Sequence, residues 1–197
     1  MTLSPHQIAV VVLAGGEGRR IGGGKPLRRL GGQTLLERAV AQALESSDSV
    51  AIAVRDPAQV GGLAAFEVIA DAAWEGPLGG LAAALAFARR RGRVAVLTLP
   101  CDMPLTPPDL ADRLAGALGE QAAALASSGG RLHPVCGLWR IEALDALPAY
   151  AAAGQRSLKG FAAGIGFVAV DWPVDPVDPF FNVNTPEDLA RAEALLG

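Results

Sequence analysis

The chain has 197 residues, of which 51% are hydrophobic and 19% are charged. This composition excludes wholesale disorder and allows a substantial core. Seventeen basic residues stand against twenty acidic ones, a formal net charge of −3, which argues against a protein that binds nucleic acid by general electrostatic attraction. Because no linker-like stretch or internal repeat interrupts the chain, we expect residues 1–197 to form a single domain.

Cysteine usage and the apolar stretches indicate the compartment. Cys101 and Cys136 match neither a disulfide framework nor a C-x-x-C metal pattern. The first seven residues lack the regions of a signal peptide, and the longest apolar stretch, at 78–88, is too short to span a bilayer. We therefore expect a soluble cytoplasmic protein that acts neither on nucleic acid nor at a membrane.

Strand-like and helix-like segments alternate from the start of the chain. Short apolar runs predict strands at residues 8–14, 50–54, 67–70, 94–99 and 167–170. Two further strands, 122–126 and 135–139, are expected to pair across a loop at 127–130. This βαβ rhythm favours a three-layer α/β/α fold with a mostly parallel sheet, joined late by antiparallel pieces.

Capping residues mark several of the predicted helices. Thr34 and Glu37 form a capping box, and Thr106 is expected to cap a helix that begins at Pro107. Further helices are predicted at 81–91, at 141–153, and at 186–196 after a Thr185 cap. Proline is expected to break or restart the helix at 141–153, because Pro148 lies inside it.

A glycine-rich loop, LAGGEGRRIGGGKPL at residues 13–27, follows the first predicted strand. Ligands of open α/β sheets collect at the carboxyl ends of strands, where glycine N–H groups can converge on phosphate oxygens. Arg20 and Lys25 add positive charge there. A dinucleotide-binding fingerprint fails because Ile21 replaces its third glycine, and a P-loop fails because Pro26 replaces its hydroxyl residue.

This loop resembles the signature of nucleotidyltransferases with the nucleotide-diphospho-sugar transferase fold, which is glycosyltransferase-A-like and Rossmann-like. Its Leu-Ala-Gly-Gly form resembles the molybdenum cofactor guanylyltransferases, the MobA-like family, in particular. The resemblance implies that the loop wraps a nucleoside triphosphate and that a lysine neutralises phosphate charge. The nucleotide-binding residues that it implies in this loop are Leu13, Ala14, Gly15, Gly16, Arg20 and Lys25.

A carboxylate follows the predicted strand at 94–99. Nucleotidyl transfer needs a divalent cation, and Mg²⁺ usually takes one or two carboxylates together with phosphate and water oxygens. Asp102 at this strand end meets the requirement, and P-C-D-x-P is similar to the metal motif of the family. We predict Asp102 as the Mg²⁺ ligand and, with Lys25, as a catalytic residue; the alternative is a turn aspartate between two prolines. Cys101 is expected to be a buried packing residue.

Other segments match the family in the same chain order. Asp71 and Gly79, the latter in the glycine-containing segment 75–81, are implied contacts of the nucleotide. Arg156 is a candidate for an acceptor phosphate. The ending F-F-N-V-N-T-P-E-D-L strongly resembles that of the family, and it places Asn182 and Asn184 on one face of an extended backbone. The alternatives are a helix cap for Asp71, a solvated residue for Arg156 and turn-bracing amides for the asparagines.

One more family motif is H-P-x-x-x-L, which His133 opens. This histidine is a candidate for contact with the acceptor, although a hydrogen-bonded structural role is the more common one for a lone histidine.

The resemblance implies a Mg²⁺-dependent enzyme that transfers GMP from GTP to the terminal phosphate of molybdopterin, forming the guanine dinucleotide cofactor and pyrophosphate. Its implied partners are GTP, molybdopterin and proteins that deliver the cofactor or receive the product. Two positions depart from the family pattern: Gly24 replaces a frequent aspartate, and Ala53 a frequent asparagine. They leave open a CTP-dependent or sugar-activating relative, and a non-catalytic nucleotide-binding module is the alternative outside enzymes.

Overall fold

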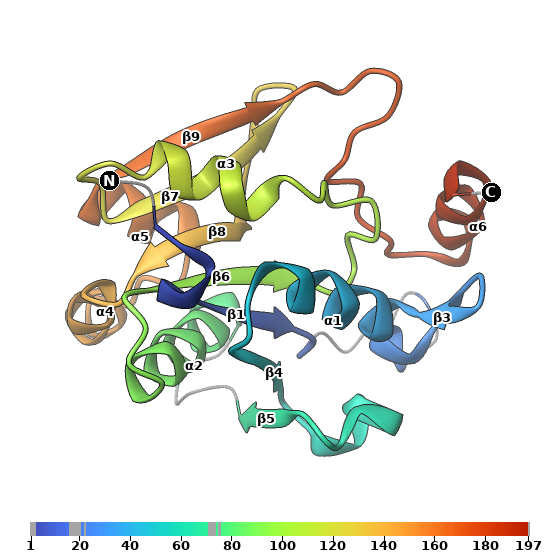
Figure 1. The fold of residues 1–197 in the computed structure, drawn as a ribbon, viewed down its shortest axis with the longest axis horizontal. Coiled ribbons are helices and arrows are strands. Elements are labelled where there is room, and N and C mark those ends of the chain that lie inside the picture. Colours follow the sequence, from blue (N-terminus) through green and yellow to red (C-terminus); the bar gives the residue numbers. More distant parts are fainter. Residues whose placement is uncertain (1–2, 16–20, 22, 71–73, 75, 197) are drawn as a thin grey trace.

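The computed structural model describes residues 3–15, 21, 23–70, 74 and 76–196, whose main feature is a seven-stranded sheet (Figure 1). The strand order is β5-β4-β1-β6-β8-β7-β9, and β8 alone runs against the others. The strands are β1 (Ile8–Leu13), β4 (Val50–Val54), β5 (Glu67–Ala70), β6 (Ala95–Pro100), β7 (Ala123–Ser128), β8 (Arg131–Arg140) and β9 (Phe167–Trp172). The mostly parallel sheet predicted from the sequence is confirmed.

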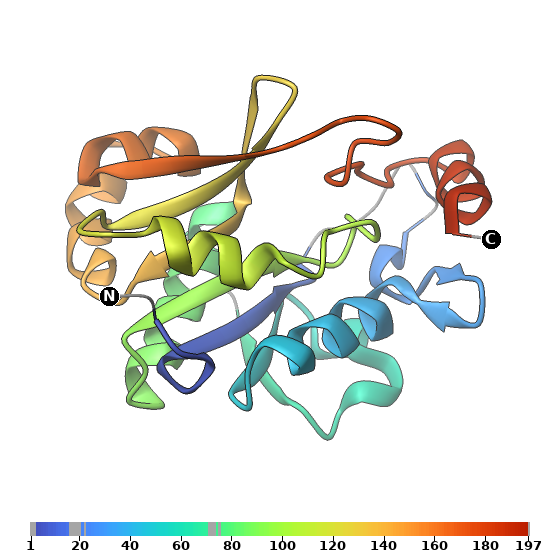
Figure 2. The same cartoon turned by 45° about the horizontal axis from the view of Figure 1, so that its top comes forward.

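Helices cover both faces of this sheet (Figure 2). On one face lie α1 (Leu35–Ser46) and α3 (Leu110–Ala117), and on the other lie α2 (Pro77–Arg90), α4 (Ala143–Ala152) and α5 (Leu158–Ile165). The strand β1 is apolar throughout because Val10 and Val12 face the first layer while Ala9 and Val11 face the second. No helix in these described ranges is long and apolar enough to cross a bilayer.

A smaller unit lies beside the carboxyl ends of β1 and β6 (Figure 1). It contains η3 (Lys25–Leu27), the two-stranded ribbon β2 (Arg29–Leu30) and β3 (Gln33–Thr34), and α6 (Pro186–Leu196). Its apolar centre is separate from the two main core layers and consists of Ile21, Leu30, Leu35, Val183 and Ala192. This small core joins the early loop region to the last helix.

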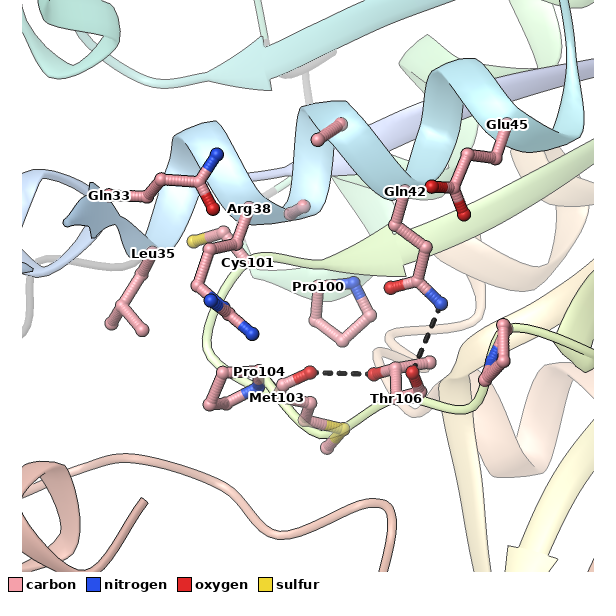
Figure 3. Close-up of a pocket in the computed structure, with 13 residues that line it drawn as sticks. Gln33, Leu35, Arg38, Gln42, Glu45, Pro100, Cys101, Met103, Pro104 and Thr106 are labelled. Carbon is pink, nitrogen blue, oxygen red and sulfur yellow. Dashed lines mark hydrogen bonds between the residues drawn. The ribbon is translucent and has the colours of Figure 1, made fainter. Parts of the chain in front are cut away.

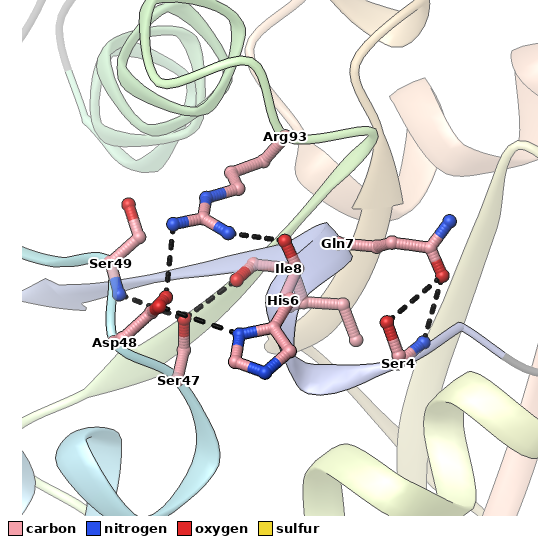
Figure 4. A network of polar contacts seen from close by, with 8 residues as sticks. All are labelled: Ser4, His6, Gln7, Ile8, Ser47, Asp48, Ser49 and Arg93. Carbon is pink, nitrogen blue, oxygen red and sulfur yellow. Dashed lines mark hydrogen bonds and ion pairs between the residues drawn. The ribbon is translucent and has the colours of Figure 1, made fainter.

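The opposite, amino-terminal edge of the sheet is held by polar contacts (Figure 4). Asp48 accepts from Arg93 at 2.9 Å and pairs with the exposed His6, whose backbone carbonyl also accepts from Arg93. Ser47 donates to the carbonyl of Ile8 at 2.6 Å. The network ties η1 (Pro5–Gln7) to the loops before β4 and β6, so the two ends of the sheet differ: one is fastened and the other carries the site described below.

Two helix starts differ from the sequence-based prediction. Helix α2 begins at Pro77 rather than at residue 81, because Gly76 turns the chain with a φ of 76° and Pro77 fits the first helical position. Helix α3 begins at Leu110 with Asp109 as N-cap, so Thr106 is not the cap. Pro107 precedes a second proline, and a residue before proline disfavours helical backbone.

The predicted effect of Pro148 is also wrong. Helix α4 continues through it, and Pro148 lies at an exposed position of this helix. The β7–β8 hairpin forms as predicted, but its turn is shorter. Only Gly129 and Gly130 lie between the strands, and both have positive φ, as a tight hairpin turn requires.

Candidate functional site

The carboxyl ends of β4, β1 and β6 lie side by side at the point where the strand order reverses. From β1 the chain proceeds outward through β4 to β5 and then returns to β6 on the other side of β1. In the sheet register, Leu13 is paired with Ala53 on one side and with Pro100 on the other. Open α/β sheets bind ligands outside the strand ends at such a switch point.

Four polar residues from distant parts of the chain converge at this edge. The ammonium of Lys25 lies 2.7 Å from Oδ2 of Asp102, 2.8 Å from Oδ1 of Asn184 and 3.4 Å from Oδ1 of Asn182. The Lys25 side chain is 8% exposed and that of Asp102 is 24% exposed. A nearly buried ammonium requires such partners because its water has been removed. We call these four residues the Lys25 cluster.

Local backbone structure places each member of the cluster. Lys25 opens η3 directly after Gly24, whose left-handed backbone (φ 57°) is a conformation that asparagine and aspartate also adopt more readily than other side chains. Asp102 follows β6, and its carbonyl accepts from the N–H of Val183 at 2.8 Å. Because Val183 is fully buried, this bond fixes the two flanking asparagines against the Asp102 turn.

The start of α6 secures the other side of the asparagines. Asp188 accepts from the backbone N–H groups of Asn184 and Thr185, each at 2.9 Å, and the Thr185 hydroxyl accepts from the N–H of Asp188 at 3.1 Å. These bonds, chiefly the one from Asn184, hold the pKa of Asp188 below its usual value. The cap predicted at Thr185 is therefore present, and it anchors Asn184 as well.

A pocket of about 240 Å³ adjoins the Lys25 cluster. It crosses the ends of β4, β1 and β6, and the beginning of α2 forms one wall. Its lining residues are Leu13, Gly15, Ala53, Arg55, Gly76, Pro77, Gly80, Pro100, Asp102, Val135 and Asn182. We call it the switch-point pocket. Apolar walls with a few convergent polar groups are typical of small-molecule sites.

Of the nine predicted site residues that the structure describes, six lie at this pocket or in the adjoining Lys25 cluster. Leu13, Gly15, Asp102 and Asn182 line it, and Lys25 and Asn184 lie in the adjoining cluster. Ala14 is buried and its N–H donates to the carbonyl of Ala53 at 2.8 Å. Gly79 is buried within α2, whereas Gly76 and Gly80 of the same segment line the pocket. The predicted contacts Gly16, Arg20 and Asp71 lie outside the described residues.

Arg156 is not part of the Lys25 cluster. It is exposed, and its guanidinium donates to the carbonyls of Ala151 and Gln155 at 2.9 and 2.7 Å. It lines a more open pocket that shares two wall residues, Pro77 and Val135, with the switch-point pocket. Val135 was not predicted as a site residue, although it lies in the H-P-x-x-x-L motif that begins at His133.

His133 and Cys101 have structural environments. The His133 ring stacks on Phe180 with centroids 4.7 Å apart, and its Nε2 lies 2.8 Å from the hydroxyl of Ser128. Burial lowers the pKa of His133, although the nearby Asp178 opposes the shift. Burial also raises the pKa of the Cys101 thiol well above its ordinary value, so this cysteine is an inert packing residue, as predicted.

A third pocket lies on the α1 side of Pro100 (Figure 3). The amide of Gln42 donates to the carbonyls of Thr106 and Pro107 at 3.1 and 3.0 Å. The Thr106 hydroxyl in turn donates to the carbonyl of Met103 at 2.6 Å. These bonds attach the segment after Asp102 to α1, and they therefore stabilise the turn that carries the Asp102 carboxylate.

Comparison with known proteins gives consistent relatives. Residues 10–166 match the family model described as MobA-like NTP transferase domain. A molybdenum cofactor guanylyltransferase of Cereibacter sphaeroides is 44% identical over 188 residues, which cover 94% of this chain and 95% of that protein. One of Rhodopseudomonas palustris is 43% identical over 206 positions, covering 99% and 97%. The crystal structure of molybdopterin-guanine dinucleotide biosynthesis protein A from Archaeoglobus fulgidus has a TM-score of 0.76 at 28% identity, covering 95% and 98%.

Proposed function

The chain belongs to the MobA-like NTP transferase family, and from this membership we propose that it transfers GMP from GTP to the terminal phosphate of molybdopterin. The products are the guanine dinucleotide form of the cofactor and pyrophosphate. The observation that carries the proposal within the molecule is the Lys25 cluster at one end of the switch-point pocket. The Lys25 ammonium and its three side-chain oxygen partners lie there beside a pocket of about 240 Å³.

The reaction forms one P–O bond and breaks another. An oxygen of the acceptor phosphate attacks the α-phosphorus of GTP, and the bond from this phosphorus to the bridging oxygen breaks as pyrophosphate leaves. A phosphate monoester loses its second proton near pH 6, so the attacking group is already anionic at neutral pH and needs no general base. The protein is required mainly to position two anions and to offset their charge.

Lys25 is the residue suited to offset the negative charge of the phosphates. Its ammonium is held by Asp102, Asn182 and Asn184, which fixes the position of the charge before the nucleotide arrives. Such pre-organisation removes most of the cost of orienting a flexible lysine side chain during the reaction. The backbone of Gly15 at the pocket wall lets the triphosphate approach closely.

Mg²⁺ fits the oxygen donors of the cluster. Within the described residues, no three His, Cys, Asp or Glu side chains gather into a metal site. One carboxylate is nevertheless sufficient when substrate phosphates and water supply the other ligands. The oxygens of Asp102, Asn182 and Asn184 already converge on one cation, the Lys25 ammonium. We propose that Asp102 holds Mg²⁺, which when bound supplies positive charge to the phosphate oxygens.

The acceptor is proposed to lie on the side of Arg156. This guanidinium belongs to the pocket that shares Pro77 and Val135 with the switch-point pocket, so an acceptor there adjoins a nucleotide held by Lys25. Arg156 can bind a phosphate by two hydrogen bonds, because two N–H groups of its guanidinium match two oxygens of the phosphate. Asn182 and Asn184 lie between Lys25 and the C-terminal helix and are the remaining acceptor candidates.

The test is pyrophosphate release by the purified chain with Mg²⁺, molybdopterin and each of the four common NTPs. We expect release with GTP, dependent on both Mg²⁺ and acceptor. Release with CTP instead would show a cytidylyltransferase, and nucleotide binding without release under any of these conditions would show a non-catalytic module.

Asp102→Asn is the variant that tests the metal assignment, because it keeps the size and one oxygen of the side chain. It should abolish Mg²⁺-dependent release. Asp112→Asn on the exposed side of α3 is the matched control, and it should retain full activity. A fully active Asp102→Asn would contradict the assignment.

A further inference from the structure

The third pocket, on the α1 side of Pro100, is separate from the switch-point pocket (Figure 3). Its volume is about 260 Å³, and its lining residues fall in two segments, residues 33–45 and residues 100–108. Among the described residues, the two pockets share only Pro100. Asp102 lines the switch-point pocket, whereas its neighbours Cys101 and Met103 line the third one, so the turn that carries Asp102 separates the two. We call the third pocket the α1 pocket.

The side chain of Arg38 extends from α1 into this pocket, toward the segment that carries Pro104 (Figure 3). Its Nε is buried and has no hydrogen-bond partner. Its two terminal nitrogens form no hydrogen bond or ion pair with a described residue either. Buried polar groups in proteins are normally paired with protein, water or an ion. A guanidinium that lines a pocket without a protein partner therefore indicates a ligand of opposite charge.

Arg93 provides a comparison, because its Nε is also buried and without a partner. The terminal nitrogens of Arg93, however, donate to Asp48 at 2.9 Å and to the backbone carbonyl of His6. The charge of Arg93 is therefore compensated within the fold, whereas the charge of Arg38 has no such compensation from the described residues.

No carboxylate on α1 compensates Arg38. Glu37, its neighbour in the chain, accepts from the N–H of Thr34 at 2.7 Å and belongs to the capping box. Glu45, the other charged residue in the lining of the α1 pocket, lies two helical turns further along. This is a rise of roughly 10 Å, over which salt largely screens the attraction. The helix begins at Leu35, so Arg38 also lies in its first turn, where the macrodipole disfavours a cation. The stability of α1 therefore does not explain this arginine.

The surroundings of the guanidinium favour an anion. Pro100 and Pro104 supply apolar walls, and a charge attracts its partner more strongly where such walls exclude water. The side-chain donors of Gln42 and Thr106 are already bound to backbone carbonyls. Arg38 is the one cationic side chain in the described lining, and the parallel N–H groups of a guanidinium match two oxygens of a phosphate or a carboxylate.

We propose that the α1 pocket is a second ligand site, which binds the oxyanion group of a small phosphorylated or carboxylated molecule through Arg38. The rest of the ligand extends along α1 toward Glu45, whose carboxylate accepts hydrogen bonds from hydroxyl or amino groups. A ligand held in this way connects α1 to the segment that follows Asp102, on the side of the turn away from the switch-point pocket. The site uses no residue of the Lys25 cluster, so the proposal does not depend on GMP transfer.

The test follows anion binding by NMR in the full, nitrogen-labelled chain. Sodium phosphate or sodium acetate replaces sodium chloride at constant ionic strength and constant pH, so that general screening does not change. The reporters are the side-chain Nε–H of Arg38 and the backbone N–H groups of Met103 and Thr106, which line the pocket. We expect saturable shifts of these signals with at least one of the two anions and none with chloride. The anion that binds more tightly distinguishes a phosphorylated from a carboxylated ligand.

Three variants complete the design. Arg38→Met keeps the apolar length of the side chain without its donors, and the affinity measured at Met103 and Thr106 should fall about tenfold or more, because hydrogen bonds between charged groups are lost. Arg38→Lys keeps the charge but not the paired N–H groups, so it should lose a smaller part of the affinity. It also provides a result if Arg38→Met fails to fold. Arg131→Met, at an exposed position outside the pocket lining, is the matched control and should bind both anions as the wild type does.

Lys25→Met separates this site from the nucleotide site, because phosphate is also expected to bind at Lys25. The shift of the Arg38 signal should persist in this variant. The proposal is overturned if neither anion shifts the Arg38 signal in the wild type, or if Arg38→Met, or Arg38→Lys in its place, binds as tightly as the wild type. It is equally overturned if the shift disappears in Lys25→Met, since the anion then acts through the nucleotide site. Pyrophosphate release is not measured here, so failure of the proposed function leaves this result unchanged.

Discussion

The ammonium of Lys25 is nearly buried, and three side-chain oxygens compensate it. Lys25 was predicted to offset phosphate charge and Asp102 to bind a metal, but the direct contact between the two side chains was not predicted. Their contact has a physical reason. Lys25 is proposed to meet phosphate and Asp102 to meet Mg²⁺. Without these ligands, the ammonium and the carboxylate are each other's nearest counter-ion.

This arrangement leads to a prediction for Lys25→Met, which keeps the length of the side chain without its charge. We expect GTP affinity to fall about tenfold or more, because one hydrogen bond to a charged group contributes about 1.5–3 kcal/mol. Titration with GTP in the presence of Mg²⁺ measures the change. Lys159→Met, at an exposed position of α5 in the Arg156 pocket and outside the Lys25 cluster, is the control for GTP binding without the acceptor, and equal affinities for both variants would contradict the role of Lys25.

A second prediction concerns His133 and pH. Burial lowers its pKa in the folded protein, so the unfolded chain binds a proton at a pH where the native protein does not. The free energy of unfolding should therefore fall as pH drops below about 6.5, the ordinary histidine value, toward the lower native value. Above about pH 6.5 the ring is neutral in both the folded and the unfolded protein, so His133 then causes no loss of stability.

The measurement compares urea unfolding of the wild type and of His133→Gln at several pH values between 7.5 and 5.5. The variant should lose less stability on acidification, because glutamine does not titrate. Parallel pH dependences for the two proteins would show that His133 takes up its proton equally well in the folded state.

At the scale of elements, strands and capped helices were predictable because their signals are local. The apolar run at β1 follows from burial on both faces, and the capping box of α1 needs only Thr34 and Glu37. Element boundaries near prolines were less predictable. Pro77 begins a helix, Pro107 delays one and Pro148 lies within one, and tertiary surroundings decide among these outcomes.

The capping box of α1 yields a prediction about stability. The Thr34 hydroxyl accepts from the N–H of Glu37 at 3.1 Å, and Glu37 accepts from the N–H of Thr34 at 2.7 Å. Thr34→Ala removes the first bond and should cost about 1 kcal/mol in the free energy of unfolding. Chemical denaturation measures it, and Thr34→Ser, which retains the hydroxyl, should recover most of the loss. A fully stable Thr34→Ala would show that the cap contributes nothing.

For the whole molecule, the site is built from chain positions that only the fold brings together. Asn184 lies 159 residues beyond Lys25 along the chain, and the C-terminal segment reaches Lys25 through the small core beside the sheet. The sequence predicted which residue types would serve and at which strand ends. It could not predict that Val183 would be the buried link, because a single valine between two asparagines carries no periodic signal.

The small core therefore couples α6 to the site, and Ala192 tests the coupling. Ala192 is fully buried among Ile21, Leu30 and Val183, so Ala192→Glu places a charge in an apolar contact and should displace the helix. Asn184 depends on α6 through Asp188, and we expect GTP affinity and turnover to fall together. Ala190→Glu, on the exposed face of the same helix, should bind GTP normally. Equal GTP affinities for the two variants would mean that the asparagines hold Lys25 without support from α6.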